Sequence, residues 1–193
     1  MLRKAALFLL IASLPLAACS KKQPAVVQPP QPTQPDTVGQ GAARARADSI
    51  AAAERARAAA EAAAREATAR ATATLQEMVF FDYDVSELRQ DAQETLGRKV
   101  PILRANPGLT LRVTGHADER GSLEYNLALG MRRAQAVKDY LAGFGIDGAR
   151  VQIDSMGEDQ PLEQGSNEEA WARNRRAEFG ITAGGAVITV PGN

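Results

Sequence analysis

Charged and polar residues that could bind a ligand gather within residues 115–121 (GHADERG), between an alternating apolar stretch and a helical one. Asn126 and Arg133 follow seven residues apart, so they share one face of the helix and can look back at Asp118. Residues 174–176 (NRR) add guanidinium groups from a distant part of the sequence. Loops between a strand and a helix are common binding sites in α/β folds. An acid, an amide and one or two guanidinium groups are therefore expected in one site.

The elements that must position these residues lie within residues 78–183, which hold nearly all the aromatic side chains. Alternating or apolar runs predict strands at residues 78–81, 109–114, 151–153 and 177–182. Apolar residues at helical spacing predict the helices between them. Their expected first residues are Ser86, Ser122 and Ser166, the last with Glu169 at capping-box spacing. The buried face of the middle helix is expected at Leu123, Leu127, Ala134, Val137 and Leu141. The order βαβαβαβ predicts an α/β fold, a two-layer α+β sandwich.

The N-terminus predicts export and lipid attachment. Charged residues and an apolar run within residues 1–18 predict a signal peptide. The apolar run is too short to form a stable transmembrane helix. The stretch Leu16-Ala17-Ala18-Cys19 resembles the lipobox of bacterial lipoproteins, and Cys19 is the only cysteine, without a disulfide partner. Lipidation of Cys19 is therefore expected, the alternative being a secreted protein with a chance cysteine.

Three further segments surround the folded region. Residues 19–41 are rich in proline and glutamine and predict a disordered linker. Residues 42–77 are mostly alanine, arginine and glutamate and predict a helical spacer, either a solvated single helix, a weak alanine coil or a frayed segment. The tail 184–193 could stay loose or add an edge strand, and the sequence does not decide.

Composition argues against several classes of protein. The 23 basic and 23 acidic residues balance, so no long-range field draws the chain to nucleic acid. One histidine and one cysteine are too few for a zinc site, and no metal or cofactor is expected. No signal for the deep cleft of a glycosidase is present, so we expect a non-enzymatic protein. A flagellar-type stator would need a membrane-spanning helix, which the sequence lacks after the signal.

The run GHADERGSLEYNLALGMRRAQAVKDYL, with FDYD before it and NRRAEF after it, resembles the OmpA-like peptidoglycan-binding domain over about residues 78–182. The resemblance implies binding of the diaminopimelate of peptidoglycan stems. It implies that Asp118 takes the ligand ammonium, that Arg133 and Arg175 take carboxylates, and that Asn126 orients the ligand or the loop. Phe81 and His116 are expected to shape the pocket.

The resemblance also implies a tether that holds peptidoglycan noncovalently from an outer-membrane lipid anchor, with its domain facing the periplasm. Ser20 after the lipidated cysteine points to the outer membrane. A Tol β-propeller protein and other Tol proteins are implied as partners in envelope integrity and cell division. A wall-binding lipoprotein without Tol partners and a peptidoglycan hydrolase are the alternatives. Three of these residues could instead have a purely structural role. Asp118 could cap a helix, Arg175 could form a surface ion pair with Glu168 or Glu169, and His116 could be a structural hydrogen-bonding group.

Overall fold

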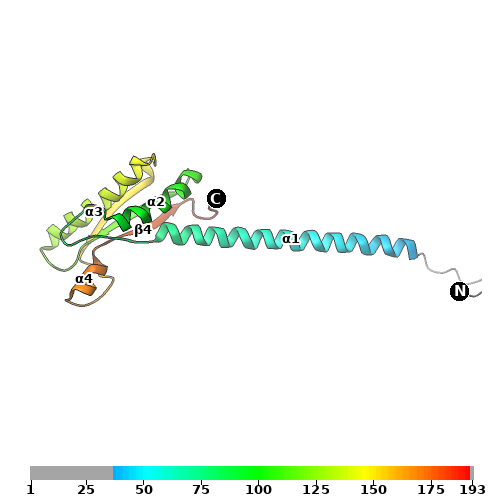
Figure 1. Ribbon diagram of the computed structural model, residues 1–193, viewed down its shortest axis with the longest axis horizontal. Coiled ribbons are helices and arrows are strands. Elements are labelled where there is room, and N and C mark those ends of the chain that lie inside the picture. Colours follow the sequence, from blue (N-terminus) through cyan, green and yellow to red (C-terminus); the bar gives the residue numbers. More distant parts are fainter. Residues whose placement is uncertain (1–36, 192–193) are drawn as a thin grey trace, which may run out of the picture. The chain divides into compact units, whose positions relative to one another are not determined.

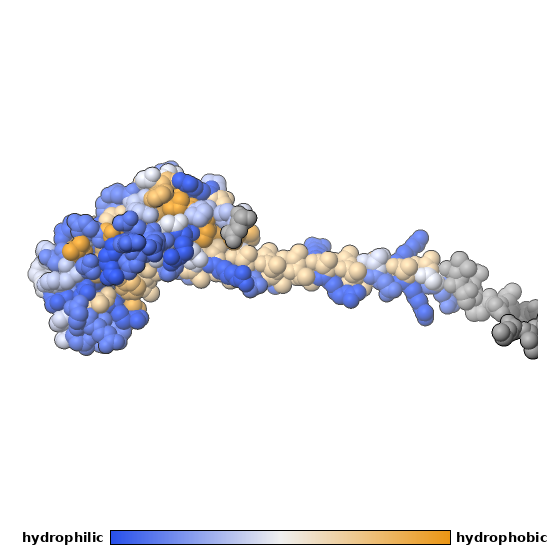
Figure 2. Space-filling model, in the orientation of Figure 1, coloured by the Kyte–Doolittle hydropathy of each residue, from blue (hydrophilic) through white to orange (hydrophobic). Residues whose placement is uncertain are grey.

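The computed structural model describes residues 37–191 and divides the chain into two units, Met1–Ala47 and Asp48–Asn193. Helix α1 (Thr37–Gln76) supplies the described residues of the first unit and continues into the second. Its alanine side chains give it a weakly apolar surface interrupted by charged residues (Figure 2). In the second unit only Ala71 and Leu75 of this helix are buried in the core. The rest of its length is therefore helical chiefly through alanine propensity.

The second unit holds a four-stranded sheet in the order β1-β4-β2-β3. Its strands are β1 (Val79–Phe80), β2 (Thr110–His116), β3 (Val151–Gly157) and β4 (Arg176–Ala183). Strands β2 and β3 are parallel, whereas β4 runs antiparallel to both of its neighbours. The predicted βαβαβαβ order and the mixed α/β fold class are confirmed.

The helices of this unit are α2 (Gln90–Ala105), α3 (Leu123–Gly143) and α4 (Glu168–Asn174), with a short 3-10 turn, η1 (Gly148–Arg150), before β3. Helices α2 and α3 lie side by side (Figure 1). Their buried faces form one core with β2 and β4, to which Ile188 of the C-terminal tail contributes. Residues 184–191 form no strand, but the Thr189 backbone exchanges hydrogen bonds with the Asn106 side chain, so this tail is packed.

The expected helix starts are right at one position and wrong at two. Ser122 caps α3 by accepting a hydrogen bond from the Tyr125 amide at 3.2 Å. Ser86 does not cap α2, which begins only at Gln90, because the preceding loop is drawn toward α3 by a hydrogen bond to the Val85 carbonyl. Helix α4 is capped by Asn167, one residue after the predicted Ser166.

The expected buried face of α3 is wrong at its first turn. Leu123 is 43% exposed and Leu127 is only half-buried, whereas Leu129, which was not expected on this face, is buried at the pocket.

Strand β2 and helix α3 approach each other through two glycines. A Cβ atom added to Gly115 would lie 1.8 Å from the Gly130 carbonyl oxygen, so no larger residue fits without moving the backbone. This approach holds α3 against the C-terminal end of β2. Residues of α3 on either side of Gly130 therefore reach the loop that follows β2.

Candidate functional site

A pocket of about 110 Å³ lies where β2 ends and α3 begins. Three of the predicted site residues, Asp118, Asn126 and Arg133, line it together. The remaining lining residues are Tyr83, Asp84, Ala117, Arg120, Gly121, Tyr125 and Leu129. The pocket thus brings two acids, an amide and two guanidinium groups into one small space.

Asp118 is almost completely buried, with 4% of its surface exposed. Its carboxylate accepts two hydrogen bonds from the Arg120 guanidinium, at 3.0 and 2.7 Å, and one from Arg175 at 3.3 Å. Burial acts to raise the pKa of Asp118, but the hydrogen bonds from Arg120 and Arg175 outweigh it and hold the pKa below its usual value. The carboxylate is therefore charged at neutral pH. Ser122 rather than Asp118 caps α3.

Asn126 holds the loop that carries Asp118. Its side-chain amide donates to the backbone carbonyls of Asp118 and Arg120, at 3.2 and 3.3 Å, and to the Glu158 carboxylate. Of the two expected tasks for Asn126, orienting the ligand or orienting the loop, these contacts serve the second.

Arg133 is fully buried beneath the pocket. Its Nε, Nη1 and Nη2 donate to the backbone carbonyls of Val85, His116 and Asp82, at 2.9, 2.7 and 3.0 Å. Burial lowers the pKa of Arg133 to about 10, which still leaves the guanidinium charged at neutral pH. Since Nη1 and Nη2 each carry a second N–H, two donors remain for a ligand.

Arg175 lies behind Asp118 and is not among the residues that line the pocket. Its Nε donates to the Phe81 carbonyl at 3.1 Å, and its Nη2 donates to Glu168 at 2.7 Å. The expected pair with Glu168 thus exists, but Arg175 itself is buried rather than on the surface. The part assigned to Arg175 in taking a ligand carboxylate stays a prediction.

The Phe81 ring is buried 5.2 Å from the Arg133 guanidinium, so it supports the pocket from below. His116 is buried at the end of β2. The expectation that His116 is a structural hydrogen-bonding group is wrong for its ring, because neither ring nitrogen has a hydrogen-bond partner among the described residues. Only its backbone carbonyl contributes, by accepting from Arg133.

The burial of His116 predicts an acid-sensitive fold. Burial, reinforced by Arg176 and opposed by Glu178, lowers the pKa of His116 from 6.5 to about 4. Between these two values the unfolded chain binds the proton and the folded one does not, so stability is complete above pH 6.5 and falls as the pH drops toward 4. We expect this residue to cost about 2 kcal/mol of unfolding free energy between pH 7 and 4.5.

Urea unfolding of the wild type and of His116→Gln across this pH range measures the effect. The carboxylates titrate in both proteins, so the difference between the two pH profiles isolates His116. Parallel profiles would show that the buried ring does not govern acid stability.

Arg120 is a site residue that the sequence analysis did not select. Its guanidinium carbon lies 3.9 Å from the centre of the Tyr83 ring and 4.1 Å from that of Trp171, so the two rings enclose it. The Trp171 indole in turn donates to Glu119 at 3.1 Å. Arg120 follows two acidic residues in the sequence, which is typical of a solvent-exposed arginine. Only its neighbours in the folded structure identify it as a site residue.

Asp84 is a second residue that the sequence analysis did not select. It lines the pocket and accepts a hydrogen bond from the Tyr125 hydroxyl. It is the only non-glycine residue among those described with a left-handed backbone, at a φ of 54°. Such strained conformations concentrate at functional sites.

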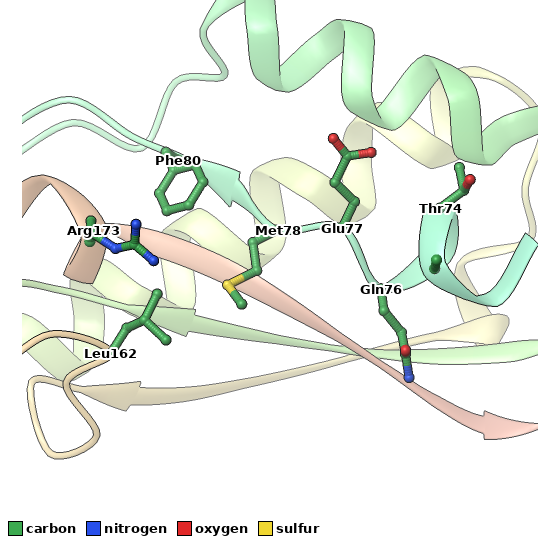
Figure 3. Close-up of a pocket in the computed structure, with 8 residues that line it drawn as sticks. Thr74, Gln76, Glu77, Met78, Phe80, Leu162 and Arg173 are labelled. Carbon is green, nitrogen blue, oxygen red and sulfur yellow. The ribbon is translucent and has the colours of Figure 1, made fainter. Parts of the chain in front are cut away.

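A larger hollow of about 660 Å³ lies beside β1 and the end of α1 (Figure 3). Met78, Phe80 and Leu162 give it an apolar lining. Its charged side chains are already paired, Glu77 with Arg98 at 2.7 Å and Arg173 with Glu163 at 3.0 Å. This hollow is therefore less suited to bind a small charged ligand than the pocket at Asp118.

Several expectations concern residues outside this pocket. The predicted signal peptide, Cys19 and the linker up to residue 36 lie outside the described residues. Residues 37–41, expected to belong to the disordered linker, instead form the start of helix α1. Within residues 37–191 no helix combines the length and apolar character needed to cross a membrane. No group of histidine, cysteine or acidic side chains in that range is placed to hold a metal ion.

The mixed α/β domain and its charged pocket match a known class of binding domain. Residues 80–175 match the OmpA family, and the chain belongs to that family. It is 45% identical over 101 residues to the peptidoglycan-associated lipoprotein of Agrobacterium fabrum (strain C58), covering 52% of this chain and 57% of that protein. It is 43% identical over 100 residues to the peptidoglycan-associated lipoprotein of Pseudomonas putida, covering 52% and 60%. The chain thus spans well under two thirds of these relatives.

Two solved structures share the fold. The peptidoglycan-associated lipoprotein of Burkholderia pseudomallei aligns with a TM-score of 0.54 at 36% identity, covering 55% of this chain and 91% of that one. The C-terminal domain of Helicobacter pylori MotB aligns with a TM-score of 0.51 at 20% identity, covering 55% and 84%, which is a likeness of fold alone. The relatives are named for an association with peptidoglycan and not for a reaction, in agreement with a non-enzymatic protein.

Proposed function

We propose that this protein binds the diaminopimelate stems of peptidoglycan noncovalently and that a lipid on Cys19 anchors it in the outer membrane, with the domain facing the periplasm. The observation that carries the proposal is the pairing of opposite charges, Asp118 and Arg133, in one pocket of about 110 Å³. The name shared by the relatives supports both the wall-binding and the lipoprotein halves.

The chemistry of the ligand fits these groups. The free end of a diaminopimelate side chain carries an ammonium and a carboxylate on one carbon. The buried Asp118 carboxylate attracts the ammonium, and the remaining N–H groups on Nη1 and Nη2 of Arg133 can donate two parallel hydrogen bonds to the carboxylate. A stem with lysine at this place lacks the carboxylate and leaves the Arg133 donors buried and unpaired, which disfavours it.

The proposal extends to partners. A Tol β-propeller protein and other Tol proteins would bind the same domain and couple it to envelope integrity and cell division. Support for this extension comes from the resemblance of residues 115–141 to the family. A wall-binding lipoprotein of the same family without Tol partners is the alternative.

Co-sedimentation with purified sacculi tests wall binding. We expect the full-length protein, in detergent, to sediment with sacculi that carry diaminopimelate stems and to bind sacculi with lysine stems about tenfold less, the cost of one buried unpaired group. Asp118→Asn keeps the size of the side chain but removes its charge, so it should lose binding at least tenfold. The matched control is Asp159→Asn at an exposed acid outside the pocket.

Circular dichroism verifies that each variant is folded. Equal binding to the two kinds of sacculi would contradict the assignment of the ligand. Full binding by a folded Asp118→Asn protein would contradict the assignment of the pocket.

A further inference from the structure

The Asp118 carboxylate has no acceptor capacity left in this structure. Its Oδ1 accepts from the Arg120 amide at 3.2 Å and from Arg120 Nε at 3.0 Å. Its Oδ2 accepts from Arg120 Nη2 at 2.7 Å and from Arg175 Nη1 at 3.3 Å. A carboxylate offers about four lone-pair sites, and all are in use. A ligand ammonium can therefore bond to Asp118 only if one of these donors leaves.

Arg120 is the donor that can leave. The Arg175 side chain is 7% exposed and is fixed by hydrogen bonds to the Phe81 carbonyl and to Glu168. The Arg120 side chain is 28% exposed and lines the pocket. The Glu168 carboxylate, 3.7 Å from Arg120 and itself largely exposed, offers an alternative partner when Arg120 turns outward. Of the two cations that contact Asp118, Arg175 is therefore fixed and Arg120 can be displaced.

Two aromatic rings stabilise Arg120 in its inward position. The guanidinium lies within 4.1 Å of the ring centres of both Tyr83 and Trp171, close enough for a cation–π attraction to each. The rings come from segments far apart in the sequence, before β2 and on α4. Arg120 is therefore held over Asp118 by its environment and not merely by its proximity in the chain.

We propose that Arg120 is an internal competitor of the ligand, occupying the ammonium position at Asp118 until a ligand ammonium displaces it. This inference rests on the proposed function of the pocket. A ligand that brings only an amine must displace Arg120 without compensation, whereas a zwitterionic end also gains the Arg133 donors. Arg120 thereby raises the ligand concentration that is needed for binding. Because Arg120 must be displaced, binding depends on both ligand charges.

The only tryptophan of the chain is Trp171, so its fluorescence reports on Arg120. We expect titration of the full-length protein with free meso-diaminopimelate to change the Trp171 emission as the guanidinium leaves the ring. Arg120→Ala should bind meso-diaminopimelate about fivefold more tightly by calorimetry, because a partly exposed ion pair no longer has to be broken. Its emission should already be shifted and should not respond to the ligand.

Two further variants complete the experiment. Arg120→Lys keeps the charge but loses the planar fork and its stacking, so its affinity should lie between those of wild type and Arg120→Ala. Arg112→Ala removes an exposed arginine on β2 and should behave as wild type. Should Arg120→Ala fail to fold, Arg120→Lys and the wild-type emission decide the question.

Unchanged or weaker binding by a folded Arg120→Ala protein would overturn the inference, as would a wild-type emission that ignores saturating ligand. These outcomes are distinct from failure of the proposed function, in which the wild type binds neither free meso-diaminopimelate nor sacculi with diaminopimelate stems.

Discussion

Replacement of Arg133 by alanine is expected to lower the free energy of unfolding by about 3 kcal/mol and to abolish binding to peptidoglycan. Arg133 is fully buried and ties the backbone at Val85, His116 and Asp82 to helix α3. Without it these carbonyls lose their donors, and the loop before α2 is no longer held against the pocket.

Urea unfolding followed by circular dichroism measures the loss, and sedimentation with sacculi measures binding under conditions where the variant is folded. Arg133→Lys keeps the charge but cannot reach all three carbonyls, so it should recover part of the stability. The neighbouring exposed Arg132 supplies the control, and Arg132→Ala should stay within about 0.5 kcal/mol of wild type. Wild-type stability of Arg133→Ala would show that these carbonyls are solvated or otherwise satisfied.

Lys99→Met should lower the free energy of unfolding by about 3 kcal/mol, although Lys99 does not line the pocket. Lys99 is fully buried, and its ammonium donates to the carbonyls of Thr74, Leu75 and Glu77 at 2.7, 3.0 and 2.6 Å. These carbonyls lie at the C-terminal end of α1, where helical partners run out. Methionine fills a similar volume but donates nothing, so the loss reports on the hydrogen bonds together with the contact of the ammonium with the Phe179 ring, 4.1 Å from its centre.

Hydrogen exchange locates this effect, because amides of residues 71–77 should exchange faster in Lys99→Met. Arg98→Ala is the matched control, since Arg98 pairs with Glu77 only at the surface and should cost less than about 1 kcal/mol. Equal losses in the two variants would mean that the buried ammonium stabilises the end of α1 no better than an exposed ion pair does.

The order of strands and helices could be predicted because burial patterns are local. Alternation at residues 109–114 and the helical spacing of Leu96, Val100 and Leu103 depend on neighbours in the sequence. The starts of α2 and α4 could not be predicted in the same way. The start of α2 depends on Arg133, which lies on another element and binds the Val85 carbonyl.

The pocket was predictable where its residues are close in the chain. Asp118, Asn126 and Arg133 belong to one loop and the helix after it, so helical geometry alone places them together. Lys99 and Arg120 were missed because their partners come from distant segments, the end of α1 for Lys99 and two aromatic rings for Arg120. In the sequence, a charged residue such as Lys99 or Arg120 is indistinguishable from a solvent-exposed one until those segments are placed.

The contact between Gly115 and Gly130 has a consequence for selectivity. Side chains that separate a strand from a helix can change rotamer and let the gap widen or narrow, but two backbones in direct contact have no such freedom. Contact between the two backbones thus sets a lower limit on the width between the Asp118 loop and helix α3. A smaller amino-acid terminus therefore cannot be held more tightly by contraction of the pocket walls.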